Sequence, residues 1–133
     1  MAQTLNHPCR VLLVEDYPAN ILVATTYLEE LGYDYDLAAN GAEAIKKAAE
    51  NAYAAILMDV QMGDIDGFEA TRLIRMQEKH VGKPNTLIIG MTAHALAGDR
   101  ERCIDAGMDD YIAKPFHPNT LKSKLALAHN EAA

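Results

Sequence analysis

The stretch Ala54-Ala55-Ile56-Leu57-Met58-Asp59 decides the fold of this chain, because it is an apolar run that ends in a single carboxylate. An apolar run this short, followed by the polar, glycine-containing segment 60–67, is typical of a buried strand in a parallel sheet. Such sheets bind ligands in the crevice at the carboxyl ends of their strands. The pattern therefore places Asp59 where chemistry is expected, although a lone aspartate at a strand end is more often a turn former.

A second apolar run in the sequence also ends in carboxylates. Residues 11–14, Val-Leu-Leu-Val, lead directly into Glu15 and Asp16. If the two strands are neighbours, as a switch point in the strand order requires, the three carboxylates converge on one small volume. Like charges at that spacing raise one another's pKa unless a cation lies among them, and oxygen ligands with room for water favour Mg²⁺. The sequence therefore predicts a magnesium site at this sheet edge.

Short apolar runs alternate with segments of helical periodicity along the whole chain, which indicates a parallel α/β sheet. The expected strands are 11–14, 33–37, 54–59, 87–91 and 111–113, the second being polar enough for a sheet edge. The expected helices are 18–31, 42–52, 68–80, a segment ending near 106, and a segment from 117 or 118 to 128. A chain of 133 residues, 50% of them hydrophobic, suits one domain. We expect a flexible leader over 1–9, the domain over 10–128 and a tail over 129–133.

The composition limits the possible partners. A formal net charge of −7 argues against nucleic acid or an anionic membrane surface as a partner of this domain. Cys9 and Cys103 lack metal-ligand spacing and are too few for a secreted disulfide framework, so we expect reduced thiols in a cytoplasmic protein. Residues 1–6 lack the pattern of a secretory signal, and no apolar run approaches the roughly 20 residues that span a bilayer.

Two further strand ends bring polar groups to the edge that carries Asp59. Thr92 follows the expected strand 87–91, and Lys114 follows the expected strand 111–113. A hydroxyl and a mobile ammonium beside a divalent cation would neutralise a phosphoryl group during its transfer. Asp59 would then be the nucleophile and would form an acyl phosphate.

Five ordered motifs give the chain a specific resemblance to a known family. They are Val-Glu-Asp (14–16), Leu-Met-Asp-Val-Gln-Met (57–62), Asp-Gly-Phe-Glu-Ala-Thr (66–71), Met-Thr-Ala-His-Ala (91–95) and Asp-Ala-Gly-Met-Asp-Asp-Tyr-Ile-Ala-Lys-Pro (105–115). Together they resemble the receiver domains of response regulators in two-component phosphorelays, and the last two are similar to receivers fused to hybrid histidine kinases. The resemblance implies a CheY-like, flavodoxin-like fold, a doubly wound (βα)5 unit with five parallel strands in the order 2-1-3-4-5.

The resemblance also implies roles for individual residues. The implied Mg²⁺ ligands are Glu15, Asp16, Asp59 and the backbone carbonyl of Gln61. The implied phosphoryl-binding residues are Asp59 as the phosphoacceptor, together with Thr92 and Lys114, with a cis bond before Pro115. Tyr17 and Gly63 depart from the asparagine and proline usual in hybrid-type receivers, and neither change removes a ligand.

Further roles concern switching and the lifetime of the phosphoryl group. Thr92 and Tyr111 are the implied switch pair, in which the aromatic ring follows the movement of the threonine. Gln61 and His94 would flank the path of attacking water and so tune how long the phosphoryl group lasts. Tyr111 can also be read as a half-buried strand tyrosine, and His94 as a solvent-facing loop histidine.

The resemblance predicts a domain that accepts a phosphoryl group from a histidine kinase or histidine phosphotransfer domain and then switches a partner-binding surface. It would catalyse only its own phosphorylation and slow dephosphorylation, either as a free-standing regulator or as part of a hybrid kinase. One alternative is a Mg²⁺-dependent phosphatase of the aspartyl-phosphate type, but Gln61 occupies the position of its second aspartate. Another is a flavodoxin-like cofactor binder, but Glu15-Asp16-Tyr17-Pro18 would repel a phosphate in the absence of metal.

Overall fold

The structure is a computed structural model in which five strands alternate with five helices over the residues that it describes. Those residues are 9–62, 65–93 and 97–132. The elements are β1 (Arg10–Val14), α1 (Pro18–Glu30), β2 (Asp34–Ala38), α2 (Gly41–Glu50), β3 (Ala55–Asp59), α3 (Gly67–Val81), β4 (Leu87–Thr92), α4 (Ala97–Ala106), β5 (Asp110–Ala113) and α5 (Pro118–Ala132). Most of these bounds lie within two residues of the sequence-based expectation, which is the usual uncertainty of an element's end.

Some sequence-based predictions fall at or beyond the described residues. The expected leader lies outside them except for Cys9, and so do Gly63 and His94. Helix α5 continues to Ala132 and so includes most of the segment 129–133 that the sequence set apart as a tail. No helix within the described ranges is long and apolar enough to cross a membrane.

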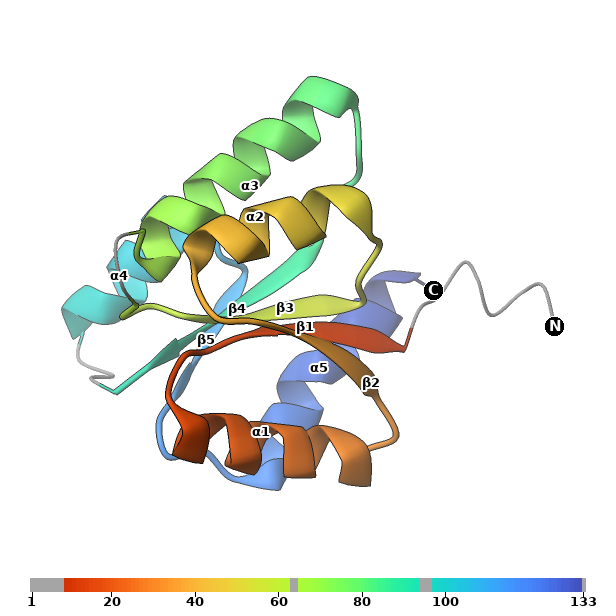
Figure 1. The fold of residues 1–133 in the computed structure, drawn as a ribbon, viewed down its shortest axis with the longest axis vertical. Coiled ribbons are helices and arrows are strands. Elements are labelled where there is room, and N and C mark those ends of the chain that lie inside the picture. The colour runs from red at the N-terminus through yellow and green to blue at the C-terminus, as the bar shows by residue number, and fades with distance from the viewer. Residues whose placement is uncertain (1–8, 63–64, 94–96, 133) are drawn as a thin grey trace, which may run out of the picture.

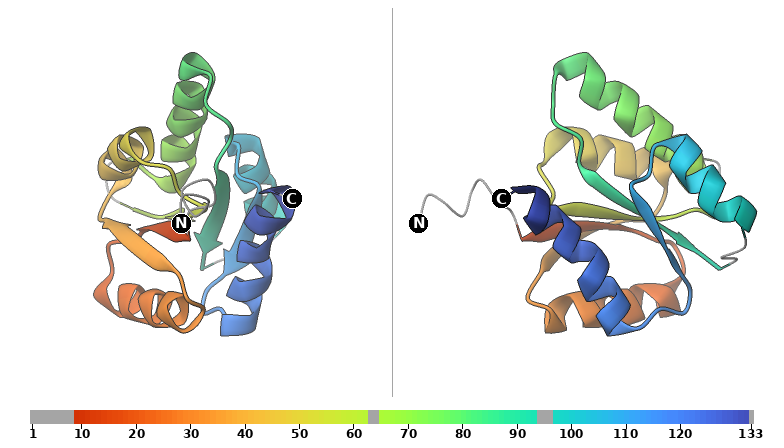
Figure 2. Two further views of the ribbon diagram at one scale, coloured as in Figure 1. Left: turned by 90° about the vertical axis from the view of Figure 1, so that its right-hand side faces the viewer. Right: turned by 180° about the vertical axis from the view of Figure 1, so that it is seen from behind.

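The sheet is parallel with the strand order β2-β1-β3-β4-β5, which confirms the predicted topology. Helices α2, α3 and α4 cover one face and α1 and α5 cover the other (Figure 1). The two rotated views show the same division into three layers (Figure 2). Strand β2 lies at one edge of the sheet, as its polar sequence predicted.

The apolar runs of the central strands fill the core on both faces of the sheet. Leu12 of β1 and Ile56 of β3 belong to the cluster packed under α2, α3 and α4. Their neighbours Leu13 and Leu57 belong to the cluster under α1 and α5. All five residues of β3 are buried, Asp59 included. Burial on both faces explains why β3 is apolar throughout instead of alternating.

Strand register brings the polar strand ends to one edge of the sheet. Val14 of β1 pairs with Met58 of β3, so Glu15, the residue after Val14, lies beside Asp59, the residue after Met58. Asp59 in turn pairs with Met91 of β4, and Thr92 pairs with Ala113 of β5. The chain also turns tightly here, because a Cβ on Gly67 would meet the backbone carbonyl of Asp59.

At the opposite end of the sheet, Arg75 of α3 joins three segments. Its guanidinium donates to Glu78 at 2.8 Å, to Asp109 at 2.8 Å, and to the carbonyls of Gly107 at 2.8 Å and Thr86 at 2.9 Å. Glu78 is buried and also accepts the backbone N–H of Thr86. This network ties α3 to the loops that precede β4 and β5.

We expect Arg75→Ala to lower the free energy of unfolding by about 3 kcal/mol, because it leaves the buried Glu78 carboxylate without its cation. Arg72→Ala is the matched control, since Arg72 makes an exposed ion pair with Glu69 at 3.3 Å. Its cost should stay below about 1 kcal/mol. Urea unfolding measures both values. Equal losses in the two variants would contradict the assigned role of Arg75.

Candidate functional site

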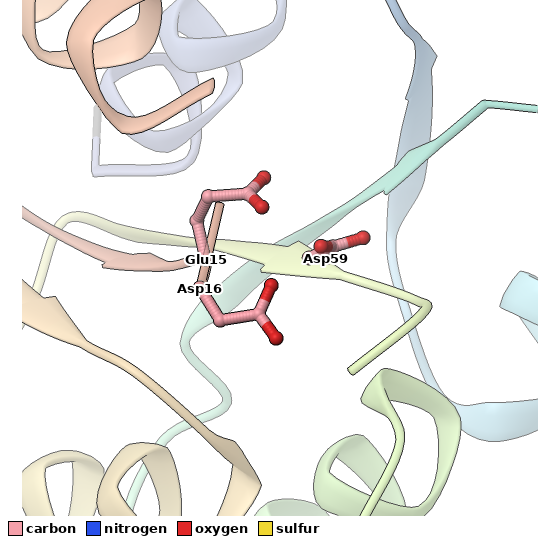
Figure 3. Close-up of side chains that lie close together, drawn as sticks. All are labelled: Glu15, Asp16 and Asp59. Carbon is pink, nitrogen blue, oxygen red and sulfur yellow. The ribbon is translucent and has the colours of Figure 1, made fainter. Parts of the chain in front are cut away.

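Three carboxylates from two strand ends gather at the carboxyl edge of the sheet. Glu15 and Asp16 follow β1, and Asp59 ends β3 (Figure 3). One oxygen of each lies within 4.8 Å of the others. Glu15 and Asp59 are buried and Asp16 is exposed. The convergence expected from the sequence is therefore present.

Lys114, directly after β5, reaches into this acidic cluster. Its Nζ lies 3.0 Å from Glu15 Oε1 and 3.2 Å from Asp59 Oδ1. The bond between Lys114 and Pro115 is cis, as the resemblance implied. With all three carboxylates ionised, one ammonium offsets only one of the three negative charges, so the cluster retains an excess of negative charge.

The start of α1 holds the Glu15 carboxylate in place. Glu15 Oε2 accepts the backbone N–H of Tyr17 at 3.2 Å and the amide of Asn20 at 3.5 Å. Pro18 is the first residue of α1, so the first turn of the helix carries Asn20 back over the end of β1. Asn20 was not among the predicted site residues. The sequence signal that could have indicated this contact was Pro18, because it marks the start of the helix that carries Asn20.

These residues surround an open cavity of about 470 Å³. Its lining includes the three carboxylates, Tyr17, Asn20, Gln61 and Lys114. Since a water molecule takes about 30 Å³ in the liquid, the cavity has room for a hydrated cation and a phosphoryl group. The donors are hard carboxylate oxygens with excess negative charge and space for water, which is the environment that suits Mg²⁺. The residues present therefore fit a magnesium ion.

The electrostatic state of Asp59 follows from its burial. Desolvation, with a smaller contribution from the nearby Glu15 carboxylate, raises the pKa of Asp59 from its usual 3.8 to about 6. The backbone N–H of Gln61, which donates to Asp59 Oδ1 at 3.1 Å, and the Lys114 ammonium act in the opposite direction. Keeping Asp59 ionised in the folded protein therefore lowers the free energy of unfolding.

This cost predicts a pH dependence of stability in Mg²⁺-free buffer. Between pH 4 and 6 the folded protein binds more protons at Asp59 than the unfolded chain, so ionisation of Asp59 lowers the free energy of unfolding as pH rises. The penalty is complete above pH 6 and reaches about 3 kcal/mol. Asp59→Asn should therefore be more stable than wild type at pH 8 and nearly equal to it at pH 4. Urea unfolding with a chelator tests this, and a gap that does not change with pH would contradict it.

The remaining predicted residues within the described part of the chain are Thr92, Tyr111 and Gln61, and not all of them line the cavity. Thr92 is buried, is not among the lining residues, and donates its hydroxyl to Asp99 Oδ2 of α4 at 2.7 Å. Tyr111 is half-buried on β5 and packs against the core under α4. Gln61 lies exposed at the rim. Asp99 was not singled out from the sequence, where it reads as an ordinary acidic residue near a helix start.

Comparison with known proteins gives a consistent result. A family model for the response regulator receiver domain matches residues 11–126. Hybrid signal transduction histidine kinase L of Dictyostelium discoideum is 39% identical to this chain over 116 residues. That match covers 85% of this chain but only 7% of the kinase, so the chain spans a small part of the length of this relative.

Two solved structures extend the comparison. The receiver domain of sensor histidine kinase PA1611 from Pseudomonas aeruginosa, with a magnesium ion coordinated in its active site cleft, is 46% identical with a TM-score of 0.80. The match covers 89% of this chain and 94% of that one. The receiver domain of Ssk1 from Saccharomyces cerevisiae, in complex with the histidine phosphotransfer protein Ypd1, is 30% identical with a TM-score of 0.84. Here the coverage is 90% of this chain and 87% of the other.

Proposed function

This chain belongs to the response regulator receiver domain family, and from this premise we propose that Asp59 accepts a phosphoryl group from a phosphohistidine. The donor would be a histidine kinase or a histidine phosphotransfer domain, as in the Ssk1–Ypd1 pair. The observation that carries the proposal is the position of Asp59, whose carboxylate faces an open cavity between Glu15, Asp16 and the Lys114 ammonium. The phosphoryl group of such a donor comes from ATP through a histidine kinase, and we therefore propose that the domain lies in the cytoplasm.

The transfer forms one bond to phosphorus and breaks another. A carboxylate oxygen of Asp59 bonds to phosphorus while the P–N bond of the donor breaks, and the electron pair leaves on the imidazole nitrogen. The Lys114 ammonium lies close to where negative charge develops on the phosphoryl oxygens and stabilises that charge. Glu15, Asp16 and Asp59 would hold Mg²⁺, with the backbone carbonyl of Gln61 as a further ligand. When bound, that ion neutralises charge on the phosphoryl oxygens.

The domain would act as a switch that modifies only itself. Thr92 would bind a phosphoryl oxygen and Tyr111 would follow it, changing the surface that a partner recognises. Gln61 and His94 would set how fast water removes the phosphoryl group. We assign residues 10–128 to this unit, which is supported by the family match over 11–126. Phosphatases of the aspartyl-phosphate type carry a second aspartate, which acts as acid and base, at the position of Gln61. The amide of Gln61 cannot take this role, so it favours a long-lived phosphoacceptor over an enzyme that turns over.

The test is phosphorylation by a small donor followed by mass spectrometry. Incubation with acetyl phosphate and Mg²⁺ should add one phosphoryl group to the intact protein, and the group should be lost in base. A chelator should suppress the gain, and borohydride reduction with peptide mapping should locate it at Asp59. A base-stable group, a group on another residue, or rapid donor turnover without any gain would overturn the proposal.

A further inference from the structure

We propose that Asp99 is a positioning residue that holds the Thr92 hydroxyl on α4 and so opposes phosphorylation of Asp59. The inference rests on the proposed function, because it assigns a control element to the same site. Asp99 lies in the first turn of α4, and its Oδ2 accepts the Thr92 hydroxyl at 2.7 Å. Thr92 is 1% exposed and the Asp99 side chain is 20% exposed, so water competes weakly for this bond.

The argument depends on the single proton of a hydroxyl group. The Thr92 hydroxyl can donate one hydrogen bond at a time, either to Asp99 or to a phosphoryl oxygen on Asp59. A bond to a carboxylate is charge-assisted and stronger than one between neutral groups. The two arrangements therefore exclude each other, and the bond to Asp99 must break before Thr92 can bind the phosphoryl group.

The surroundings of Asp99 provide an alternative partner once Thr92 leaves. Asp99 Oδ1 lies 3.9 Å from Nη1 of Arg102, one turn further along α4. The guanidinium of Arg102 lies 4.5 Å above the ring of Phe68, at the start of α3. A separate cavity of about 430 Å³, lined by these three side chains and by Gln61, leaves room for them to rearrange.

Release of Thr92 would therefore draw Arg102 away from the Phe68 ring and shorten its existing 3.9 Å ion pair with Asp99, which would compensate for the lost hydrogen bond. The contact between α3 and α4 would then change in step with the state of Asp59. Asp99 would thus couple the phosphoryl site to the surface of α4 through a hydrogen bond that exists only before phosphorylation.

Two substitutions separate the hydrogen bond from the charge of Asp99. Asp99→Ala removes both, whereas Asp99→Asn removes the charge but keeps an oxygen acceptor for Thr92. With acetyl phosphate and Mg²⁺, Asp99→Ala should be phosphorylated about tenfold faster than wild type. Asp99→Asn should be phosphorylated only about threefold faster than wild type, because its neutral amide oxygen keeps a hydrogen bond of roughly half the strength. Asp105→Ala, on the exposed side of the same helix, is the control and should not change the rate.

A double-mutant cycle tests whether the effect passes through Thr92. In a Thr92→Ala background, Asp99→Ala should leave the phosphorylation rate unchanged. Equal acceleration by Asp99→Ala and Asp99→Asn would show that charge alone acts and would overturn the proposal. Acceleration that persists without the Thr92 hydroxyl would overturn it as well.

A measurement on the unphosphorylated protein keeps this test separate from the proposed function. NMR of the Thr92 γ-methyl group reports the rotamer of its side chain. Asp99→Ala should redistribute that rotamer clearly, and Asp99→Asn should redistribute it less. An unchanged Thr92 rotamer in Asp99→Ala would refute the positioning role, whereas a wild type that takes up no phosphoryl group would refute only the proposed function.

Discussion

Asp59→Asn should take up no phosphoryl group under conditions in which the wild type gains one. An amide oxygen is a poor nucleophile, and the substitution otherwise preserves the size of the side chain. Loss of a catalytic nucleophile typically costs at least about 10⁴-fold in rate. Intact-mass measurement after incubation with acetyl phosphate and Mg²⁺ should therefore show a single unmodified species.

The matched control is another aspartate of the same loop. Asp66 caps α3, its side chain accepting the backbone N–H of Glu69 at 2.9 Å. Asn is an equally good cap, so Asp66→Asn should fold normally and should still be phosphorylated. Uptake by Asp59→Asn, or loss of uptake in Asp66→Asn, would assign the acceptor role to a different residue.

The sequence predicted the fold because its signals are local and repeated. The apolar runs that became β1, β3 and β4 are buried on both faces, so no alternation was needed to recognise them. The strand ends then placed Glu15, Asp16, Asp59 and Lys114 at one edge, since parallel strands share their direction. The meeting of these four residues at one edge therefore follows from the topology.

The contacts that the sequence did not reveal depend on how the elements and loops are placed in the folded structure. Arg75 and Asp109 are 34 residues apart, and each reads as an ordinary charged residue on its own element. The bond from Thr92 to Asp99 crosses a segment without clear periodicity, so neither the start of α4 nor its orientation could be predicted. The contact of Asn20 with Glu15 similarly depends on how tightly α1 follows β1.

Lys114→Met should slow phosphorylation of Asp59 by about 10²- to 10³-fold, the usual cost of removing one preorganised group that stabilises developing charge. Methionine keeps much of the length of the stem but removes the ammonium that lies 3.2 Å from Asp59 Oδ1. The rate is measured as the appearance of phosphorylated protein at fixed acetyl phosphate and Mg²⁺. Lys124→Met is the control, because Lys124 makes an ion pair of similar length, 2.9 Å, with Asp110 and is not among the cavity-lining residues.

The same variant separates the structural role of Lys114 from its chemical role. Without its ammonium, the buried carboxylates of Glu15 and Asp59 repel each other, so Mg²⁺-free stability should fall by about 3 kcal/mol. Added Mg²⁺ should restore much of that stability, because a cation again lies among the carboxylates. It should not restore the rate, since the charge that faces the phosphoryl oxygens remains absent. If saturating Mg²⁺ restores both, Lys114 acts only as a counterion, and stabilisation of the transferring group must come from another residue.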